Sequence, residues 1–258
     1  MVLHRMRAHV TDHNWFAVAV DVGIVVVGVF LGTQANNWNE TRVERAAASA
    51  ARREIIDDLR TNEVLIASRK AYYSTVRGHA LAVLDQLERP GDRRGAPFLV
   101  DAYQASQVWL RPLARAGYDE MTGAGLSRSI GDRETRTQLT AYYNTIRQFD
   151  VTALGMTSYR ERLRRSMPYK VQLAVKLQCP ERVANEAAGD ELLIMPDRCA
   201  LDLDPSAVAA AVARIDSPDL VEDLNRHIAD LDQKLLGAER VGRMARELRL
   251  DLESAEGD

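Results

Sequence analysis

The sequence predicts an all-α protein in which one N-terminal transmembrane helix precedes a bundle of long helices. The first reason is an apolar run of nineteen residues near the N-terminus that contains one charged residue. The second is that apolar residues recur at helical spacing in long stretches farther along the chain. The expected organisation is a tail at 1–13, a transmembrane helix at 14–35 and a helical extramembrane domain at 36–258, with long helices at about 40–89, 132–166 and 217–250.

The apolar run, from Trp15 to Thr33, has the length of a membrane span. At a rise of 1.5 Å per residue it covers about 28 Å, close to the roughly 30 Å thickness of the hydrocarbon layer. The alternatives are the core helix of a soluble domain and a cleaved signal peptide, which Arg5 and Arg7 ahead of the run would suit. Because the run is longer than the roughly 7–15 residues of a signal core and contains an acid, we predict a retained anchor.

Asp21 is the charged residue of this run, and a carboxylate at the centre of a span costs about 2.5–3.5 kcal/mol. On a helix it shares one face with a G-x-x-x-G pair, whose small residues let another helix approach closely. The predicted partner stripe is Ala17, Asp21, Gly28 and Gly32. Two interpretations stay open: the stripe faces a helix of the same or another protein, or Asp21 reaches toward the headgroups or is protonated.

A polar motif follows the run, formed by Gln34, Asn36, Asn37, Trp38, Asn39 and Glu40. Its carboxamides can bind headgroups, water or neighbouring helices, and the tryptophan suits the membrane interface. Because asparagine also caps helices, the motif could equally mark a break between the span and the next helix. We expect an interfacial or capping role.

The run Val20–Glu40 resembles the N-terminal signature of a family of uncharacterised bacterial single-span membrane proteins, a domain of unknown function. In that family an acid-led Val/Ile/Gly span ends in Gln-x-Asn-Asn-Trp-Asn-Glu, and Asp21 departs from the expected Glu. A second segment, Tyr118–Tyr143, is similar to the family in its Tyr-Asp-Glu-Met turn, its small residues and its final Tyr-Tyr pair. The resemblance implies a single-pass topology and implies no activity.

The stretch after the motif predicts a long helix, since from residue 40 to 89 it has no proline and Gly78 is its one glycine. Apolar residues recur every seven positions at Leu59, Ile66, Tyr73, Ala80 and Leu87, flanked by Ile55, Val76 and Val83. A coiled-coil dimer is one way to cover this seam. Polar Asn62 and Arg69 at the alternating core positions favour an intramolecular bundle instead.

The rest of the domain is predicted from helix boundaries and apolar faces. The segment 90–97 reads as a linker, 98–109 as a shorter helix and 111–130 as an irregular connection. Asp132 and Ser217 are expected N-caps of the last two long helices. The buried sides of those helices are predicted to be Leu139, Tyr142, Tyr143, Ile146, Phe149 and Leu154, and Leu224, Ile228, Leu231, Leu235, Ala238, Ala245, Leu248 and Leu252.

The two cysteines of the chain, Cys179 and Cys199, flank an irregular excursion. A disulfide there would contribute about 3 kcal/mol and needs an oxidising compartment, whereas two isolated thiols are the alternative. Four arginines follow the span closely, and taken literally they place the domain in the cytoplasm. That charge rule is weaker for a long domain, so we predict a bacterial inner-membrane protein with a cytoplasmic N-terminus and a periplasmic domain.

Charge and motifs narrow the function classes. A net charge of -3 gives no bulk field for nucleic acid, and none of the usual catalytic, metal-binding or phosphate-binding motifs is present. We therefore predict no catalytic site, metal or cofactor, and a membrane-anchored interaction or scaffold module of the cell envelope. Its expected partners are the lipid bilayer and a membrane helix in a homo- or hetero-oligomer. The alternative is an envelope sensor whose bundle binds a small ligand and signals through the span.

Overall fold

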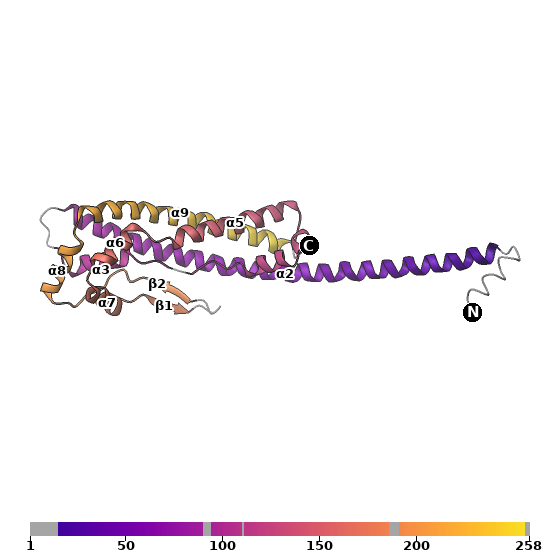
Figure 1. Cartoon of the computed structure of the whole chain (residues 1–258), viewed down its shortest axis with the longest axis horizontal. Helices are drawn as coiled ribbons and strands as arrows, with labels where there is room; N and C mark the ends of the chain where they lie inside the picture. Colours follow the sequence, from indigo (N-terminus) through magenta and orange to yellow (C-terminus); the bar gives the residue numbers. More distant parts are fainter. Residues whose placement is uncertain (1–14, 90–93, 110, 186–190, 256–258) are drawn as a thin grey trace.

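The computed structural model describes residues 15–89, 94–109, 111–185 and 191–255, apart from the side chains at 15–17, 154, 185 and 191. These residues form an elongated helical bundle from which a single helix projects far beyond the rest (Figure 1). The described residues are all-α, as the sequence predicts, apart from one short hairpin that it does not predict.

The projecting helix, α2, runs without interruption from Trp15 to Glu88, a length of 74 residues. It joins the predicted span and the predicted long helix at 40–89 into one element, so the expectation that the polar motif caps or breaks the helix is wrong. The motif's side chains are satisfied on the helix surface: the Asn36 amide donates to Glu40 over 2.6 Å, and the Thr41 hydroxyl donates to the Asn37 carbonyl over 2.8 Å. Because no glycine or proline lies between Gly32 and Gly78, nothing in the backbone stops the helix.

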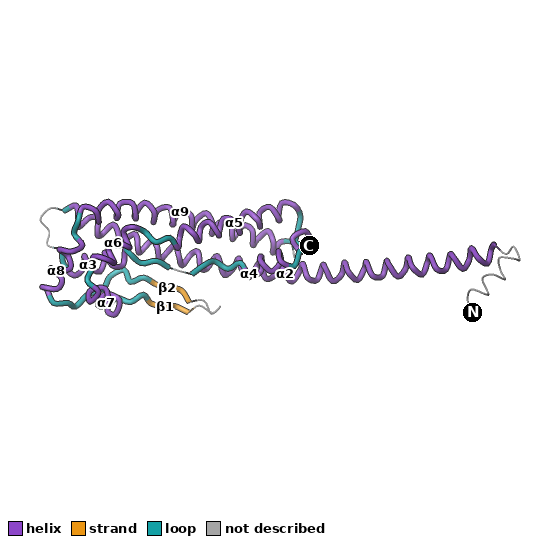
Figure 2. The backbone as a smooth tube through the Cα atoms, viewed as in Figure 1, coloured by secondary structure: helices purple, strands orange, loops and turns teal. Residues whose placement is uncertain are grey.

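Two other long helices lie beside the second half of α2, as Figure 2 shows. Helix α5 (Arg133–Leu154) runs parallel to α2, and α9 (Pro218–Ser254) runs antiparallel to it and contacts both. The predicted seam of α2 is buried in the core, and so are the described members of the predicted α5 and α9 faces, with Leu87, Ile228 and Leu235 partly covered. An intramolecular bundle therefore covers the seam. Leu154, whose side chain is not described, lies outside this comparison.

The predicted helix at 132–166 is two helices, which corrects the sequence-based boundary. Its start is confirmed, because the Asp132 side chain accepts the Thr135 N–H over 2.8 Å. The chain then leaves α5 at Gly155, which has extended backbone angles, and Thr157 caps α6 (Ser158–Ser166). The break lets α6 pack against α3 and α9, where the Tyr159 hydroxyl donates to the Ala102 carbonyl over 3.0 Å.

The connection between α2 and α5 is more helical than the sequence predicts. The expected helix at 98–109 is α3, Ala96–Ala105, and the expected irregular stretch at 111–130 contains α4 (Ala116–Gly123) and a 3-10 turn, η1 (Leu126–Arg128). Between α3 and α4 lies a segment named here the strap, residues 106–115, whose described residues belong to no helix or strand; Leu110 is not described.

The remaining elements lie toward the end of the bundle that is farthest from the projecting part of α2, with the hairpin extending back along the side of the bundle (Figure 1). They are α7 (Tyr169–Gln178), the antiparallel strands β1 (Arg182–Asn185) and β2 (Glu191–Ile194), and α8 (Pro205–Ile215). Cys179 and Cys199 lie at disulfide distance, with Cα atoms 5.7 Å apart, and close the excursion that carries the hairpin. The sequence predicts this closure but not the two strands.

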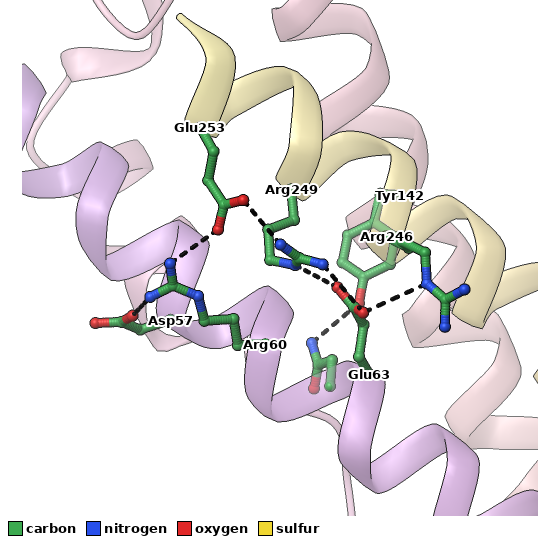
Figure 3. A network of polar contacts seen from close by, with 8 residues as sticks. Asp57, Arg60, Glu63, Tyr142, Arg246, Arg249 and Glu253 are labelled. Carbon is green, nitrogen blue, oxygen red and sulfur yellow. Dashed lines mark hydrogen bonds and ion pairs between the residues drawn. The ribbon is translucent and has the colours of Figure 1, made fainter. Parts of the chain in front are cut away.

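Charged side chains join α9 to α2 near the point where α2 leaves the bundle (Figure 3). Arg249 pairs with Glu63 over 2.6 Å and with Glu253 over 2.8 Å, and Arg60 connects Glu253 to Asp57. Because Glu63 and Arg249 are largely shielded from solvent, this pair is the part of the network that can add measurable stability.

Candidate functional site

The N-terminal part of α2 has the properties of a membrane-spanning helix. Every side chain from residue 19 to residue 46 is exposed, and a strongly apolar window of 18 residues lies within this part with none of it buried. Among the described residues, α2 is the one helix long and apolar enough to cross a membrane. A contiguous apolar surface of this size marks a site for a membrane or a partner.

The predicted partner stripe lies entirely on this exposed part. Gly28 and Gly32 have no atom within 4 Å of the position that a Cβ would take, and Asp21 is exposed. Ala17 lies on the same helix, and its side chain is outside the described residues. No other described element covers the stripe, so its role stays a prediction.

The polar motif is also exposed along its whole length, including the Trp38 ring, which is 69% exposed. The remaining motif residues, Gln34 and Asn39, lie on the exposed helix with it. An interfacial role is compatible with this placement and stays a prediction.

Inside the bundle, buried polar side chains hold the backbone of the strap. Asn62 makes two hydrogen bonds with Ala114, one accepting its N–H over 2.6 Å and one donating to its carbonyl over 2.8 Å. Arg69 donates to the carbonyl of Arg111 and pairs with Asp150 over 2.8 Å.

The same kind of contact continues along the strap. Asp150 accepts the Leu113 N–H over 3.0 Å, and Tyr73 accepts the Trp109 N–H over 3.3 Å. Buried backbone groups outside helices and strands need partners from neighbouring elements. The polar core positions of α2 therefore have a structural role in the folded bundle.

An open cavity of about 670 Å³ lies between α2, the start of α3 and the segment that carries Cys199. The lining residues are Ser74, Thr75, Gly78, His79, Ala82, Pro97, Val100, Asp101, Asp197, Arg198 and Cys199. It combines small, apolar and charged side chains.

His79 joins the three walls of this cavity. Its Nδ1 lies 2.8 Å from a carboxylate oxygen of Asp101, and its Nε2 lies 2.9 Å from the carbonyl oxygen of Pro196. A carboxylate and a carbonyl oxygen are both acceptors, so this placement favours the imidazolium form, in which both ring nitrogens donate. Burial alone would lower the pKa of His79, but the bonds to Asp101 and Pro196 outweigh it and raise the pKa above its ordinary value.

The sequence does not predict this cavity, because its residues come from three separated segments. Gly78 is the one local indication of it, since a glycine in the middle of a long helix lowers helix stability and is expected where a side chain would be unfavourable. The cysteines were predicted, and Cys199 contributes to the cavity wall. No cluster of His, Cys, Asp or Glu suited to a metal ion occurs in the described part of the chain.

Comparison of the chain with protein-family models, with curated proteins and with solved structures finds no match. The resemblance of residues 20–40 and 118–143 to a single-span family therefore stays a prediction.

Proposed function

We propose that this chain is a single-pass protein of the bacterial inner membrane whose bundle serves as an interaction or scaffold module of the cell envelope. The observation that carries the proposal is the continuity of α2. Its first part is apolar and exposed, and its second part provides one wall of the bundle core. Burying the apolar part in lipid removes the largest exposed apolar surface of the described chain from water.

The geometry of α2 supports a rigid stalk between the bilayer and the bundle. Residues 34–46 are exposed and mostly polar, and as an α-helix they span about 20 Å. The ion pairs between α2 and α9 fix the bundle to the base of this stalk. A partner that binds the bundle would thus be held at a set distance from the membrane surface.

A periplasmic bundle, with the N-terminus in the cytoplasm, is the orientation that we propose. The pairing of Cys179 with Cys199 supports it, because disulfides persist in oxidising compartments. The arginines after the span favour the opposite orientation. An impermeant thiol reagent applied to intact spheroplasts decides between them: labelling only after added reductant supports the periplasm, and labelling only after lysis contradicts it.

The stripe of Asp21, Gly28 and Gly32 is the proposed contact with a helix of another chain. Helix association in lipid depends on close approach at small residues and on polar groups that find partners. The test is copurification of the full-length protein from membranes in a mild detergent. We expect Asp21→Leu and Gly28→Leu each to lose a partner or a self-oligomer that the wild type retains.

Phe30→Leu is the matched control, because Phe30 lies on the opposite face of the same helix and the change preserves its apolar character. A partner lost equally in the control would contradict a specific stripe, and so would a partner indifferent to all changes. The anchor itself is tested separately by ultracentrifugation of lysed cells. Full-length protein in the supernatant would overturn the proposed membrane attachment.

The alternative function, an envelope sensor, is favoured by one specific observation. Five residues of the cavity wall belong to the same helix as the candidate span, namely Ser74, Thr75, Gly78, His79 and Ala82. Gly78, in the middle of this group, lies 45 residues beyond Thr33, or about 70 Å along the helix axis. A ligand in the cavity would therefore contact the element that reaches the membrane.

A further inference from the structure

One wall of the cavity beside His79 is made of α2 residues with little side-chain bulk, namely Ser74, Thr75, Gly78 and Ala82. Gly78 is the informative member. A glycine inside a helix is less favourable than alanine, and it is usually retained where a neighbour comes too close for a Cβ. Here no atom lies within 4 Å of that position, so packing does not explain the glycine. Its missing methyl group keeps the cavity floor open.

Two of the four charged groups that line the cavity neutralise each other. His79 donates to Asp101 over 2.8 Å, and both are largely buried, which leaves no net charge at that wall. The same histidine holds the Pro196 carbonyl, and Cys199 ties the following residues to the end of α7. The segment at 196–199 is therefore fixed at both ends.

The other two charged groups, Asp197 and Arg198, lie on this fixed segment and face the cavity. Neither forms an ion pair with another residue in the described part of the chain; Asp197 accepts a long hydrogen bond of 3.5 Å from Thr75, and its charge also acts on His79. Both side chains are exposed to solvent, so each can exchange water for a ligand group. The cavity thus presents one carboxylate and one guanidinium next to each other.

We propose that this cavity binds a small zwitterion of the free α-amino acid class. The guanidinium of Arg198 would bind the carboxylate, for which its planar fork is suited, and the carboxylate of Asp197 would bind the ammonium group. The ligand side chain would lie over Gly78 toward Ala82 and Val100. A volume of about 670 Å³ lies within the size range of small-molecule sites. This site does not depend on how the chain is anchored.

The test uses the full-length protein in detergent and the twenty L-amino acids as probes. Thermal shift identifies the best amino acid, and titration calorimetry measures its Kd. We expect at least one saturable ligand, and we expect the amine and the carboxylic acid that each lack one of its charges to bind at least tenfold more weakly. Absence of saturable binding by all twenty overturns the proposal, and equal binding of a singly charged analogue overturns the zwitterion assignment.

Three variants locate the site. Arg198→Gln and Asp197→Asn should each raise the Kd at least tenfold, while Arg226→Gln, an exposed arginine of α9 outside the cavity lining, should leave it unchanged. Gly78→Ala separates binding from folding, because the better helix former should raise Tm and the added methyl group should weaken binding. Binding unchanged in Gly78→Ala and in the bulkier Gly78→Leu would place the ligand elsewhere and refute the site.

Discussion

The hydroxyl group of Tyr73 connects α2 to both the strap and α5. It accepts the Trp109 N–H over 3.3 Å and donates to the Ala153 carbonyl over 2.9 Å, and the ring is 2% exposed. In Tyr73→Phe the ring still fills its place, but one buried donor and one buried acceptor lose their partner. A buried backbone group without a partner costs about 1–3 kcal/mol, so we expect a loss of about 3 kcal/mol for the two together.

Tyr143→Phe is the matched control for this change. Tyr143 is equally buried, at 2% exposed, and its hydroxyl has no hydrogen-bond partner among the described residues. Its ring stacks on that of Tyr118 with centroids 4.1 Å apart, a contact that phenylalanine preserves. Removing an unsatisfied buried hydroxyl should leave stability unchanged or raise it.

Thermal unfolding of the full-length protein in detergent, followed by circular dichroism, measures both variants. For a domain of this size, about 3 kcal/mol corresponds to a fall in Tm of about 6–12 °C. We expect that fall for Tyr73→Phe and no fall for Tyr143→Phe. If the two variants lose similar stability, the strap is not held by the Tyr73 hydroxyl and the reasoning about its backbone partners is wrong.

Glu63→Gln weakens the shielded pair with Arg249 and should lower the free energy of unfolding in urea by about 1–2 kcal/mol. The exposed Asp57→Asn change should lower it by under about 0.5 kcal/mol. Equal effects of the two changes would count against the network. Burial lowers the pKa of His227 from 6.5 to about 4, so the unfolded chain binds a proton at a higher pH than the folded chain does. The free energy of unfolding should therefore fall by about 3 kcal/mol as the pH drops through this interval. His227→Gln should flatten that part of the curve of stability against pH, and an unchanged curve would contradict the assignment. Cys199→Ser opens a loop with a separation of 20 residues and should cost about 3 kcal/mol, measured against wild type with and without reductant; reductant that leaves the wild type unaffected would argue against the bond.

The structure also predicts opposite pH responses at its two buried histidines. The pKa of His79 is raised, so its contribution to stability is complete below the ordinary pKa and is lost as the pH rises through the folded-state pKa. Burial is the main cause of the lowered pKa of His227, whose buried Nδ1 has no partner within the described residues. Stability should therefore fall as the pH drops from 6.5 toward the lowered pKa of His227, and should also fall as the pH rises through the raised pKa of His79.

Periodicity alone was sufficient to predict the helices that bury a continuous apolar face. The spacing of apolar residues predicts the α2 seam through Leu59 and Ile66. It also predicts the α9 face that begins after the Ser217 cap. The sequence also predicted the pairing of Cys179 with Cys199, because the chain offers no other cysteine. These features depend on local chemistry or on composition.

Boundaries that depend on competing local signals were predicted less well. The amides near Asn36 suggested a helix end, yet their side chains bond along the helix surface and α2 continues. Helix α5 ends at Gly155, and Thr157 caps the start of α6, so these two residues separate the helices. Capping residues permit a helix end without requiring one, so the rest of the fold decides.

The sequence by itself determined that this is a helical protein with one apolar segment suited to a membrane, since both conclusions follow from the spacing of apolar residues along one chain. Only the tertiary structure decided why Asn62 and Arg69 are buried, because their partners lie 52 and 42 residues away on the strap and farther still on α5. It also decided that His79, Asp101 and Arg198 share one cavity. Residues distant in sequence form one site only when folding brings their side chains together, so no local sequence pattern can predict that site.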